Sequence, residues 1–429
     1  MSDYNDVSQE TLKAVAEYHE HTRGGFLPLP IPIVKAQDYK LWDSDGKEYL
    51  DFLSMFAVVN MGHSHPKIVS AMVKAIQDRA LVNTAFVSPS YAALAAKIHQ
   101  IFGYNRCVAM LSGADATDTA TKIARKWGYK VKGITAGKAF VLTTSSCYHG
   151  LTISTHSFTS SKDENFGPFV PFVGYISPSG IPVEYGDLTS LEKALEKDHE
   201  TIAAFMVEPI QGAAGIIDPP EGYFKAAFSL CKKFNVLFIA DEVQTGLGRA
   251  GYVLKSWSSG VQPDLVCLGK AIAGGMTPLS IVMGNNSVMD LIEKGDIGST
   301  FGATPPATES ALAALSVLID EDLATRSLEL GKLMRKLVQD QNLPQIETLT
   351  GEGLLCAAVL KNPSERFNAR RLAALCATKG LVIGPIANSR VRLCPPLTIK
   401  EYDLRRAVEI FAQSCRELES IDGPIIGIP

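Results

Sequence analysis

Two residues that follow apolar runs could do covalent chemistry together. Lys270 comes two residues after the run Leu265–Leu268, and Asp241, 29 residues upstream, directly follows the run 236–240. Desolvation lowers the pKa of a lysine at the end of a buried strand and makes its amine nucleophilic. A Schiff base with a carbonyl cofactor uses such an amine, and a buried aspartate is the usual partner of a pyridinium nitrogen. A lone lysine in such a loop is more often a surface residue, but the pairing with Asp241 predicts a pyridoxal phosphate site.

A loop of small residues could hold the phosphate of such a cofactor. Ser112, Gly113 and Ala114 precede a predicted helix over 116–127. Loop amides and the N-terminus of a helix together form an anion site. An ordinary helix cap without a ligand has the same residue types, so the loop alone leaves both interpretations open.

Six stretches, in order and with the same spacing, resemble the class III (ornithine/ω-amino acid) aminotransferases of fold type I, from about residue 35 onward. They are Asn60-Met61-Gly62-His63-Ser64-His65-Pro66, Ala124-Arg125-Lys126-Trp127-Gly128-Tyr129, Val207-Glu208-Pro209-Ile210-Gln211-Gly212, the segments around Asp241 and Lys270, and Gly298-Ser299-Thr300-Phe301-Gly302. The resemblance implies an α/β fold, in which a large domain carries a mostly parallel mixed sheet flanked by helices. The chain ends would form a smaller α+β domain.

The resemblance also implies roles around the cofactor. Tyr148 would stack on the pyridine ring with His149 beside it, Gln244 would bind the phenolic oxygen, and Glu208 would lie nearby. In the phosphate loop, backbone amides would do most of the binding. Ser299 and Thr300 would reach the phosphate of a neighbouring subunit, which implies a homodimer. Tyr148 could instead be a packed core residue, and Glu208 a structural corner before a proline.

The substrate positions depart from the ornithine enzymes, which the chain otherwise resembles most. Where those enzymes carry two aromatic hydroxyls, an arginine and a glutamate, this chain has Phe56, Val87, Leu151 and Ala213; a second arginine is kept as Arg392. Ornithine carries three charged groups, and burying them against apolar side chains would leave charges unpaired. We therefore expect ornithine not to be the main substrate.

Arg392 is the expected site for an acidic substrate. In the ornithine enzymes, the glutamate at the position of Ala213 can mask this arginine. With alanine there, we expect Arg392 to bind the carboxylate of a 2-oxo acid such as 2-oxoglutarate or pyruvate. The donor would be an amine or amino acid with a largely apolar body. Alternatively, Arg392 only supports the proline turn that follows it.

Three kinds of protein fit these residues. The first is an aminotransferase, in which Lys270 moves the proton and a 2-oxo acid completes the cycle. The second is an amino acid racemase or epimerase on the same scaffold, which needs a second acid or a reoriented intermediate because one lysine serves one face. The third is a non-catalytic binding protein, against which the retained Lys270, Asp241 and Gln244 argue. The aminotransferase is the reading we adopt.

The elements that must position these residues follow from apolar patterning. Short continuous apolar runs over 139–143, 203–207, 236–240 and Leu265–Leu268 predict strands buried on both faces of a mostly parallel sheet. Helices over 116–127 and 222–233 would cover it. We also expect helices over 10–22, 307–340 and 402–418, strands over 354–360 and 391–394, and two strands around an Asp-Gly turn within 39–52. The expected domains are an N-terminal segment 1–67, a large cofactor-binding domain 68–330 and a C-terminal domain 331–429.

Composition sets the remaining expectations. With 429 residues, 46% apolar and 20% charged, the chain is typical of a globular protein of more than one domain. A net charge of −4 gives no reason to expect nucleic acid or an anionic membrane as partner. The polar start Met1–Asp6, the eight scattered cysteines and the lack of an apolar stretch of about 18 residues favour the cytosol. His63 and His65 have metal-pair spacing but match the family's Gly-His-x-His-Pro turn, and we predict no metal.

Overall fold

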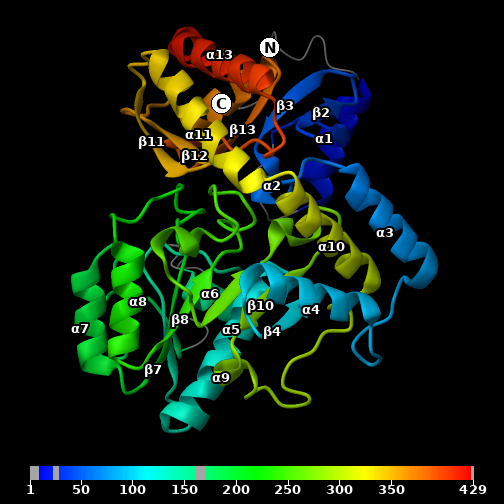
Figure 1. The fold of residues 1–429 in the computed structure, drawn as a ribbon. Coiled ribbons are helices and arrows are strands. Elements are labelled where there is room, and N and C mark those ends of the chain that lie inside the picture. Colours follow the sequence, from blue (N-terminus) through cyan, green and yellow to red (C-terminus); the bar gives the residue numbers. More distant parts are fainter. Residues whose placement is uncertain (1–8, 23–28, 160–170, 427–429) are drawn as a thin grey trace. The chain divides into compact units, whose positions relative to one another are not determined.

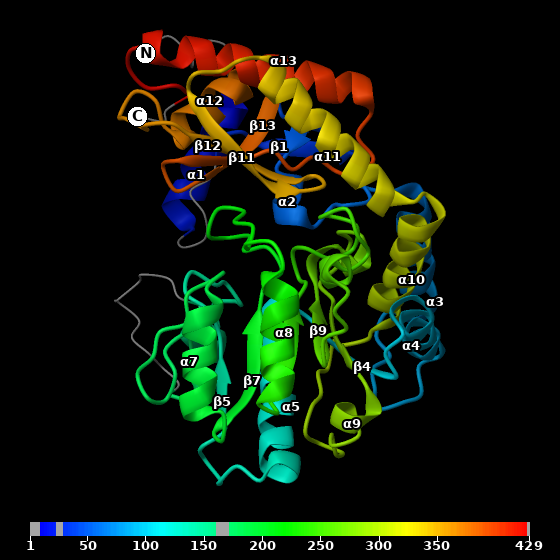
Figure 2. The ribbon, with the colours of Figure 1, turned by 60° about the vertical axis from the view of Figure 1, so that its left-hand side comes forward.

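The computed structural model describes residues 9–22, 29–159 and 171–426. The polar start Met1–Asp6, the first two residues of the proline-rich segment 27–32 and the last three residues of the chain lie outside this description. The chain divides into two compact units, one comprising residues 66–324 and the other the residues up to 65 and from 325 on. Figure 1 shows both, and Figure 2 gives a second view.

The larger unit is built on a seven-stranded sheet in the order β4-β10-β9-β8-β7-β5-β6. Its strands are β4 (Arg106–Met110), β5 (Phe140–Leu142), β6 (Val173–Gly174), β7 (Ile202–Val207), β8 (Leu237–Asp241), β9 (Leu265–Leu268) and β10 (Ser280–Gly284). β10 runs antiparallel to both of its neighbours, and the other strands are parallel to one another. The mostly parallel mixed sheet predicted from the sequence is confirmed. Every residue of β7, β8 and β9 is buried, as continuous apolar runs require.

Helices cover both faces of this sheet. They are α3 (Pro66–Arg79), α4 (Pro89–Phe102), α5 (Gly113–Trp127), α6 (Ile153–Phe158), α7 (Leu188–Asp198), α8 (Tyr223–Lys233), α9 (Asn286–Met289) and α10 (Pro305–Asp320), with short helical turns η1 (Gly128–Lys132), η2 (Lys255–Ser259) and η3 (Lys270–Ala273). Side chains of α5 pack with Ile239 of β8 in one core cluster. The preceding residue, Phe238, points to the other face, where its ring contacts Phe224 and Phe228 of α8. Alternation along one strand thus places α5 and α8 on opposite faces, and α7 lies beside α8 (Figure 2).

The smaller unit joins the two ends of the chain in a second seven-stranded sheet, in the order β1-β2-β3-β13-β14-β12-β11. Its strands are β1 (Ile33–Gln37), β2 (Lys40–Asp43), β3 (Glu48–Phe52), β11 (Ile346–Glu352), β12 (Leu355–Leu360), β13 (Leu381–Ile386) and β14 (Arg390–Arg392). The only parallel pair of this sheet, β3 with β13, joins an N-terminal strand to a C-terminal one. The predicted Asp-Gly turn is confirmed between β2 and β3, where Gly46 has a φ of 82°.

The helices of this unit are α1 (Gln9–His21), α2 (Ser54–Ala57), α11 (Leu323–Asp340, within the unit from residue 325), α12 (Ala369–Thr378) and α13 (Glu401–Glu417), with the turn η4 (Leu418–Ser420). The helix expected over 307–340 is divided into α10 and α11. Between them Asp322 has a φ of 44°, which a right-handed helix cannot contain.

Two further observations bear on the setting of the protein. All eight cysteines are free, and all but Cys107 are buried. None of the helices in the described ranges combines the length and apolar character needed to cross a membrane.

Candidate active site

Polar residues follow four strands of the larger unit at one edge of its sheet. β4, β7, β8 and β9 run in the same direction, so their carboxyl ends meet at that edge. Ser112 comes two residues after β4, Glu208 directly follows β7, Asp241 ends β8 and Lys270 comes two residues after β9. Ligands of open α/β sheets bind outside the carboxyl ends of the strands. The sheet therefore brings together residues that are far apart in the sequence.

Glycines let the phosphate loop and the lysine segment approach each other. A Cβ added to Gly269 would lie 3.3 Å from the Cα of Gly113 and 3.2 Å from Cγ1 of Val243. A Cβ on Gly113 would lie 2.8 Å from the same Val243 atom, and one on Gly150 would lie 2.6 Å from the Cβ of Ala114. The lack of side chains at Gly113, Gly150 and Gly269 thus lets these segments pack closely around the start of α5.

The start of α5 has the features of an anion site. Ser112 caps the helix, because its hydroxyl accepts a hydrogen bond from the amide of Asp115 at 3.1 Å, and its own amide donates to the Asp115 carboxylate at 2.7 Å. The amides of Gly113 and Ala114 belong to the first turn, where a helix offers no acceptor of its own. Together with the positive end of the helix dipole they suit a phosphate group.

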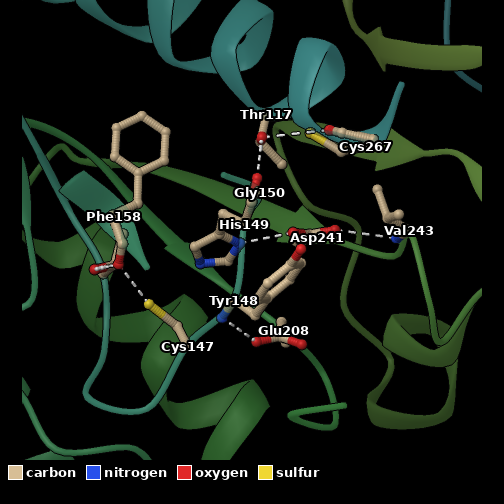
Figure 3. A network of polar contacts seen from close by, with 12 residues as sticks. Thr117, Cys147, Tyr148, His149, Gly150, Phe158, Glu208, Asp241, Val243 and Cys267 are labelled. Carbon is tan, nitrogen blue, oxygen red and sulfur yellow. Dashed lines mark hydrogen bonds and ion pairs between the residues drawn. The ribbon is translucent and has the colours of Figure 1, made fainter. Parts of the chain in front are cut away.

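Asp241 is held by two hydrogen bonds at the centre of the site. Its Oδ2 accepts from Nδ1 of His149 at 2.6 Å, and its Oδ1 accepts from the amide of Val243 at 3.0 Å. Both side chains are buried. Burial by itself lowers the pKa of His149, but the sulfur of Cys147 and the carboxylate of Asp241 raise it, to well above the usual value of an imidazole. These two hydrogen bonds fix the orientation of the Asp241 carboxylate (Figure 3).

The sequence analysis missed the residues that anchor His149. The hydroxyl of Thr117, on α5, donates to the His149 carbonyl oxygen at 2.7 Å, and the thiol of Cys147 donates to the Phe158 carbonyl oxygen at 2.8 Å (Figure 3). No motif marks Thr117; the only signal is its place one helical turn after the phosphate loop. Its contact joins the phosphate loop to the segment that carries Tyr148 and His149.

Glu208 joins two other segments of the site. Its Oε1 accepts from the amide of Tyr148 at 2.9 Å, and its Oε2 accepts from the amide of Gly212 at 3.0 Å. The side chain of Gln244 lies against the backbone of Gly212, since a Cβ added to Gly212 would lie 1.5 Å from the Gln244 Oε1. Complete burial raises the pKa of Glu208 to about 7, with a further contribution from Asp241. Glu208 therefore positions both Tyr148 and the segment on which Gln244 rests.

Lys270 has an unusual backbone conformation. It follows the buried strand β9, begins the turn η3 and has a φ of 46°, in the left-handed region. Non-glycine residues in this region are uncommon and concentrate at functional sites. The side chain is half-buried.

The described groups fit the three reactive ends of pyridoxal phosphate. Amides at the start of α5 suit the phosphate, the oriented carboxylate of Asp241 suits the ring nitrogen, and the amine of Lys270 suits the carbonyl carbon. The glycine contacts between Gly113 and Gly269 bring the first and third of these segments together. Among the described residues, no group of three or more His, Cys, Asp or Glu side chains could hold a metal ion.

Five further residues expected at the site belong to the larger unit: Ser299, Thr300, Leu151, Ala213 and Val87. The amide group of Asn83 donates to the Thr300 carbonyl oxygen at 3.2 Å, and the Ser299 hydroxyl accepts from the amide of Gly302 at 3.1 Å. Leu151 directly follows Gly150 and Ala213 follows Gly212, and both side chains are exposed. Val87 is 91% exposed and lines a groove with Tyr91 and Arg106; none of the residues expected to bind the cofactor lines that groove.

Phe56 and Arg392 meet in the smaller unit. The Arg392 guanidinium carbon lies 5.5 Å from the centre of the Phe56 ring, at a distance typical of a cation–π contact. Phe56 belongs to α2, where all four residues have positive φ values between 48° and 71°. Left-handed helical conformation costs a non-glycine residue about 1–2 kcal/mol, so contacts elsewhere must hold this turn. No pattern in the sequence predicts this turn.

Comparison with known proteins identifies the family of the chain and a relative of similar sequence. Residues 23–415 match the family described as Aminotransferase class-III. An ornithine aminotransferase of Emericella nidulans is 40% identical over 420 residues, which cover 97% of this chain and 92% of that protein.

Solved structures agree over nearly the whole chain. An acetylornithine aminotransferase from Elizabethkingia anophelis has a TM-score of 0.85 and 38% identity, covering 95% of this chain and 99% of that one. The ornithine aminotransferase from Toxoplasma gondii ME49 has a TM-score of 0.90 and 35% identity, covering 96% and 97% of the two chains. Another structure of the Toxoplasma gondii enzyme is described as showing partial occupancy of pyridoxal phosphate at its active site.

Proposed function

The chain belongs to the class-III aminotransferase family and is a pyridoxal phosphate-dependent aminotransferase, and on this premise we propose which substrates it takes. The amino donor is an amine or amino acid with a largely apolar body, and the acceptor is a 2-oxo acid bound by Arg392. Ornithine is not the preferred donor, although a relative at 40% identity is named for it.

Lys270, Asp241 and His149 each have a separate role in the proposed reaction. Pyridoxal phosphate, when bound, supplies a carbonyl carbon for the amino group and a ring that withdraws electrons. The amine of Lys270 would hold the cofactor through its carbonyl carbon, and it would serve as the base that takes the proton from the amine-bearing carbon of the donor. The carboxylate of Asp241 would hold the ring nitrogen in its protonated form, and His149 orients that carboxylate through its hydrogen bond to Oδ2.

The contact between Phe56 and Arg392 carries the acceptor assignment. Arg392 is buried on β14 with its guanidinium carbon 5.5 Å from the Phe56 ring centre. A guanidinium presents its donors in pairs within its plane, and a carboxylate binds such a pair. The donor assignment rests on Phe56, Val87, Leu151 and Ala213, none of which carries a charge to pair with a second ammonium group.

A panel of donors tests this proposal. Each amine or amino acid is mixed with the enzyme without acceptor, and conversion of the cofactor from its aldehyde to its amine form is followed by absorbance. Apolar amines and amino acids should react with a higher kcat/KM than ornithine. Ornithine as the best donor of the panel would show the proposal to be wrong. The relatives are aminotransferases by name, and we do not propose the racemase alternative.

We also propose that the enzyme acts as a homodimer. The segment around Asn83, which contacts Thr300, carries large apolar side chains that are strongly exposed in the single chain, including Phe86 at 73% and Val87 at 91%. Exposed apolar patches of this kind mark protein interfaces, and a second copy of the chain would cover them. Sedimentation at assay concentration tests this: a fully active monomer would exclude the dimer. A cytosolic location and the domain boundaries at residues 67 and 330 also remain proposals.

A further inference from the structure

The turn α2 has a backbone that its sequence does not favour. Ser54, Met55, Phe56 and Ala57 have φ values of 49°, 48°, 62° and 71°. The left-handed region is normally visited by glycine, asparagine or aspartate, and then as single residues. Four consecutive residues of other types can adopt it only where surrounding contacts determine the conformation.

Asp51 holds the entrance to this turn. Its side chain is completely buried, and its Oδ1 accepts hydrogen bonds from the amides of Leu53 and Ser54, both at 2.8 Å. Its Oδ2 lies 2.8 Å from Nε2 of His63, which donates to it. A single carboxylate therefore orients both the start of the turn and the segment that follows it.

Ser54 ties the turn to the segment that carries Arg392. Its buried hydroxyl donates to the carbonyl oxygen of Cys394 at 2.6 Å, and the amide of Cys394 donates to the carbonyl oxygen of Phe52 at 2.8 Å. Cys394 is two residues from Arg392, so these bonds fix the turn and the arginine to each other on both sides.

Gly384 makes room for the same arrangement on the neighbouring strand β13. A Cβ at this position would lie 2.7 Å from Cδ1 of Leu53 and 3.4 Å from both Cβ and Cδ of Arg392. The residue before the turn and the arginine thus lie against one glycine, and the Phe56 ring is left against the guanidinium.

We propose that Asp51 and Ser54 are positioning residues: through the left-handed turn they hold the Phe56 ring against the guanidinium of Arg392 and so orient that guanidinium for the carboxylate of the acceptor. The inference rests on the proposed function, which assigns that carboxylate to Arg392. A preset guanidinium loses less conformational freedom on binding, so the device acts on affinity for the acceptor.

Phe56→Leu and Phe56→Tyr form the first test, in the full-length enzyme with cofactor. Leucine keeps the apolar character but removes the aromatic face, whereas tyrosine retains it. Phe56→Leu should raise the KM for 2-oxoglutarate or pyruvate, whichever the enzyme accepts, by about three- to thirtyfold, the range of a partly buried cation–π contact. The visible absorbance of the bound cofactor should stay nearly unchanged, any change in kcat should be smaller than the rise in KM, and Phe56→Tyr should keep a KM near that of the wild type.

Asp51→Asn and Ser54→Ala test the positioning role. Each should raise the same KM, and combining either with Phe56→Leu should add little, because all three act through one contact. Ser54→Ala removes only the hydroxyl that binds Cys394 and serves where Asp51→Asn does not fold. Effects on kcat and cofactor absorbance without an effect on the KM would indicate a merely structural role and overturn the inference.

Arg392→Lys separates this inference from the function on which it rests. An unchanged KM for the oxo acid in that variant would overturn the acceptor assignment itself. A large rise in KM for Arg392→Lys, together with no change for Phe56→Leu, would leave the acceptor assignment in place and overturn the positioning role.

Discussion

His149 Nδ1 lies 2.6 Å from Asp241 Oδ2, although the two residues are 92 positions apart in the chain. The contact forms because the segment after β5 and the end of β8 reach the same edge of one parallel sheet. The partner that orients the Asp241 carboxylate is thus supplied by fold topology rather than by a local motif.

Replacement of Asp241 by asparagine tests its role at the ring nitrogen. Without the carboxylate the ring loses its proton and withdraws electrons poorly, so kcat should fall by several orders of magnitude and cofactor binding should weaken. His149→Asn keeps a donor for the carboxylate and should retain more activity than His149→Leu. Steady-state kinetics decide: a loss below about tenfold for Asp241→Asn, about 1.4 kcal/mol, contradicts the assignment.

Lys270→Ala removes the amine that binds the cofactor carbonyl and moves the proton. Turnover should be lost to little or nothing, and an added small amine should restore part of it, because the amine takes over the proton transfer. Lys255→Ala, an exchange on a lysine outside the site, is the control and should keep its turnover. Normal kinetics of Lys270→Ala without added amine would rule out the role.

Continuous apolar runs were enough to predict β7, β8 and β9, because strands buried on both faces leave a pattern in the sequence. The break at Asp322 and the turn α2 could not be predicted in this way. Each depends on positive φ values at non-glycine residues, and in α2 these are held by contacts from Asp51 and Cys394. The approach of His149 to Asp241 likewise exists only once the sheet has formed.

Glu208 makes the free energy of unfolding depend on pH. Its pKa is about 7 in the fold and near 4.5 in an unfolded chain, so the fold binds this proton more tightly. The resulting stabilisation is complete below about pH 4.5, declines as the pH rises to about 7 and changes no further above that. Glu208→Gln cannot titrate. The unfolding free energy of the wild type minus that of the variant, from urea denaturation of cofactor-free protein, should fall over this range; a constant difference would contradict the shift.

Substitutions of Met55 test the left-handed conformation of the turn with little effect from lost side-chain contacts, because the Met55 side chain is partly exposed. Met55→Gly and Met55→Ala remove the same side chain, but at a φ of 48° only alanine retains the left-handed penalty. Glycine should therefore be the more stable of the two by about 1 kcal/mol. Val58, with a φ of −90° and a ψ of −36°, is the control, and there alanine should be the more stable. Thermal unfolding of these two variants and of Val58→Gly and Val58→Ala measures the stability difference between glycine and alanine at each position. The same difference at both positions would show that the turn is not left-handed.

Leu151 offers a gain-of-function test of the donor assignment. It directly follows Gly150, whose backbone packs on Ala114 of the phosphate loop, and its side chain is 62% exposed. The ornithine enzymes carry an arginine at this position, which a leucine cannot replace as a partner for a carboxylate. One hydrogen bond to a charged group contributes about 1.5–3 kcal/mol, so Leu151→Arg should raise kcat/KM for ornithine by at least about tenfold and lower it for apolar donors. Ile153→Arg, two residues further on and 67% exposed, is the matched control. If Leu151→Arg leaves the order of donors unchanged, or if Ile153→Arg changes it equally, Leu151 does not face the donor and the apolar assignment loses its main support.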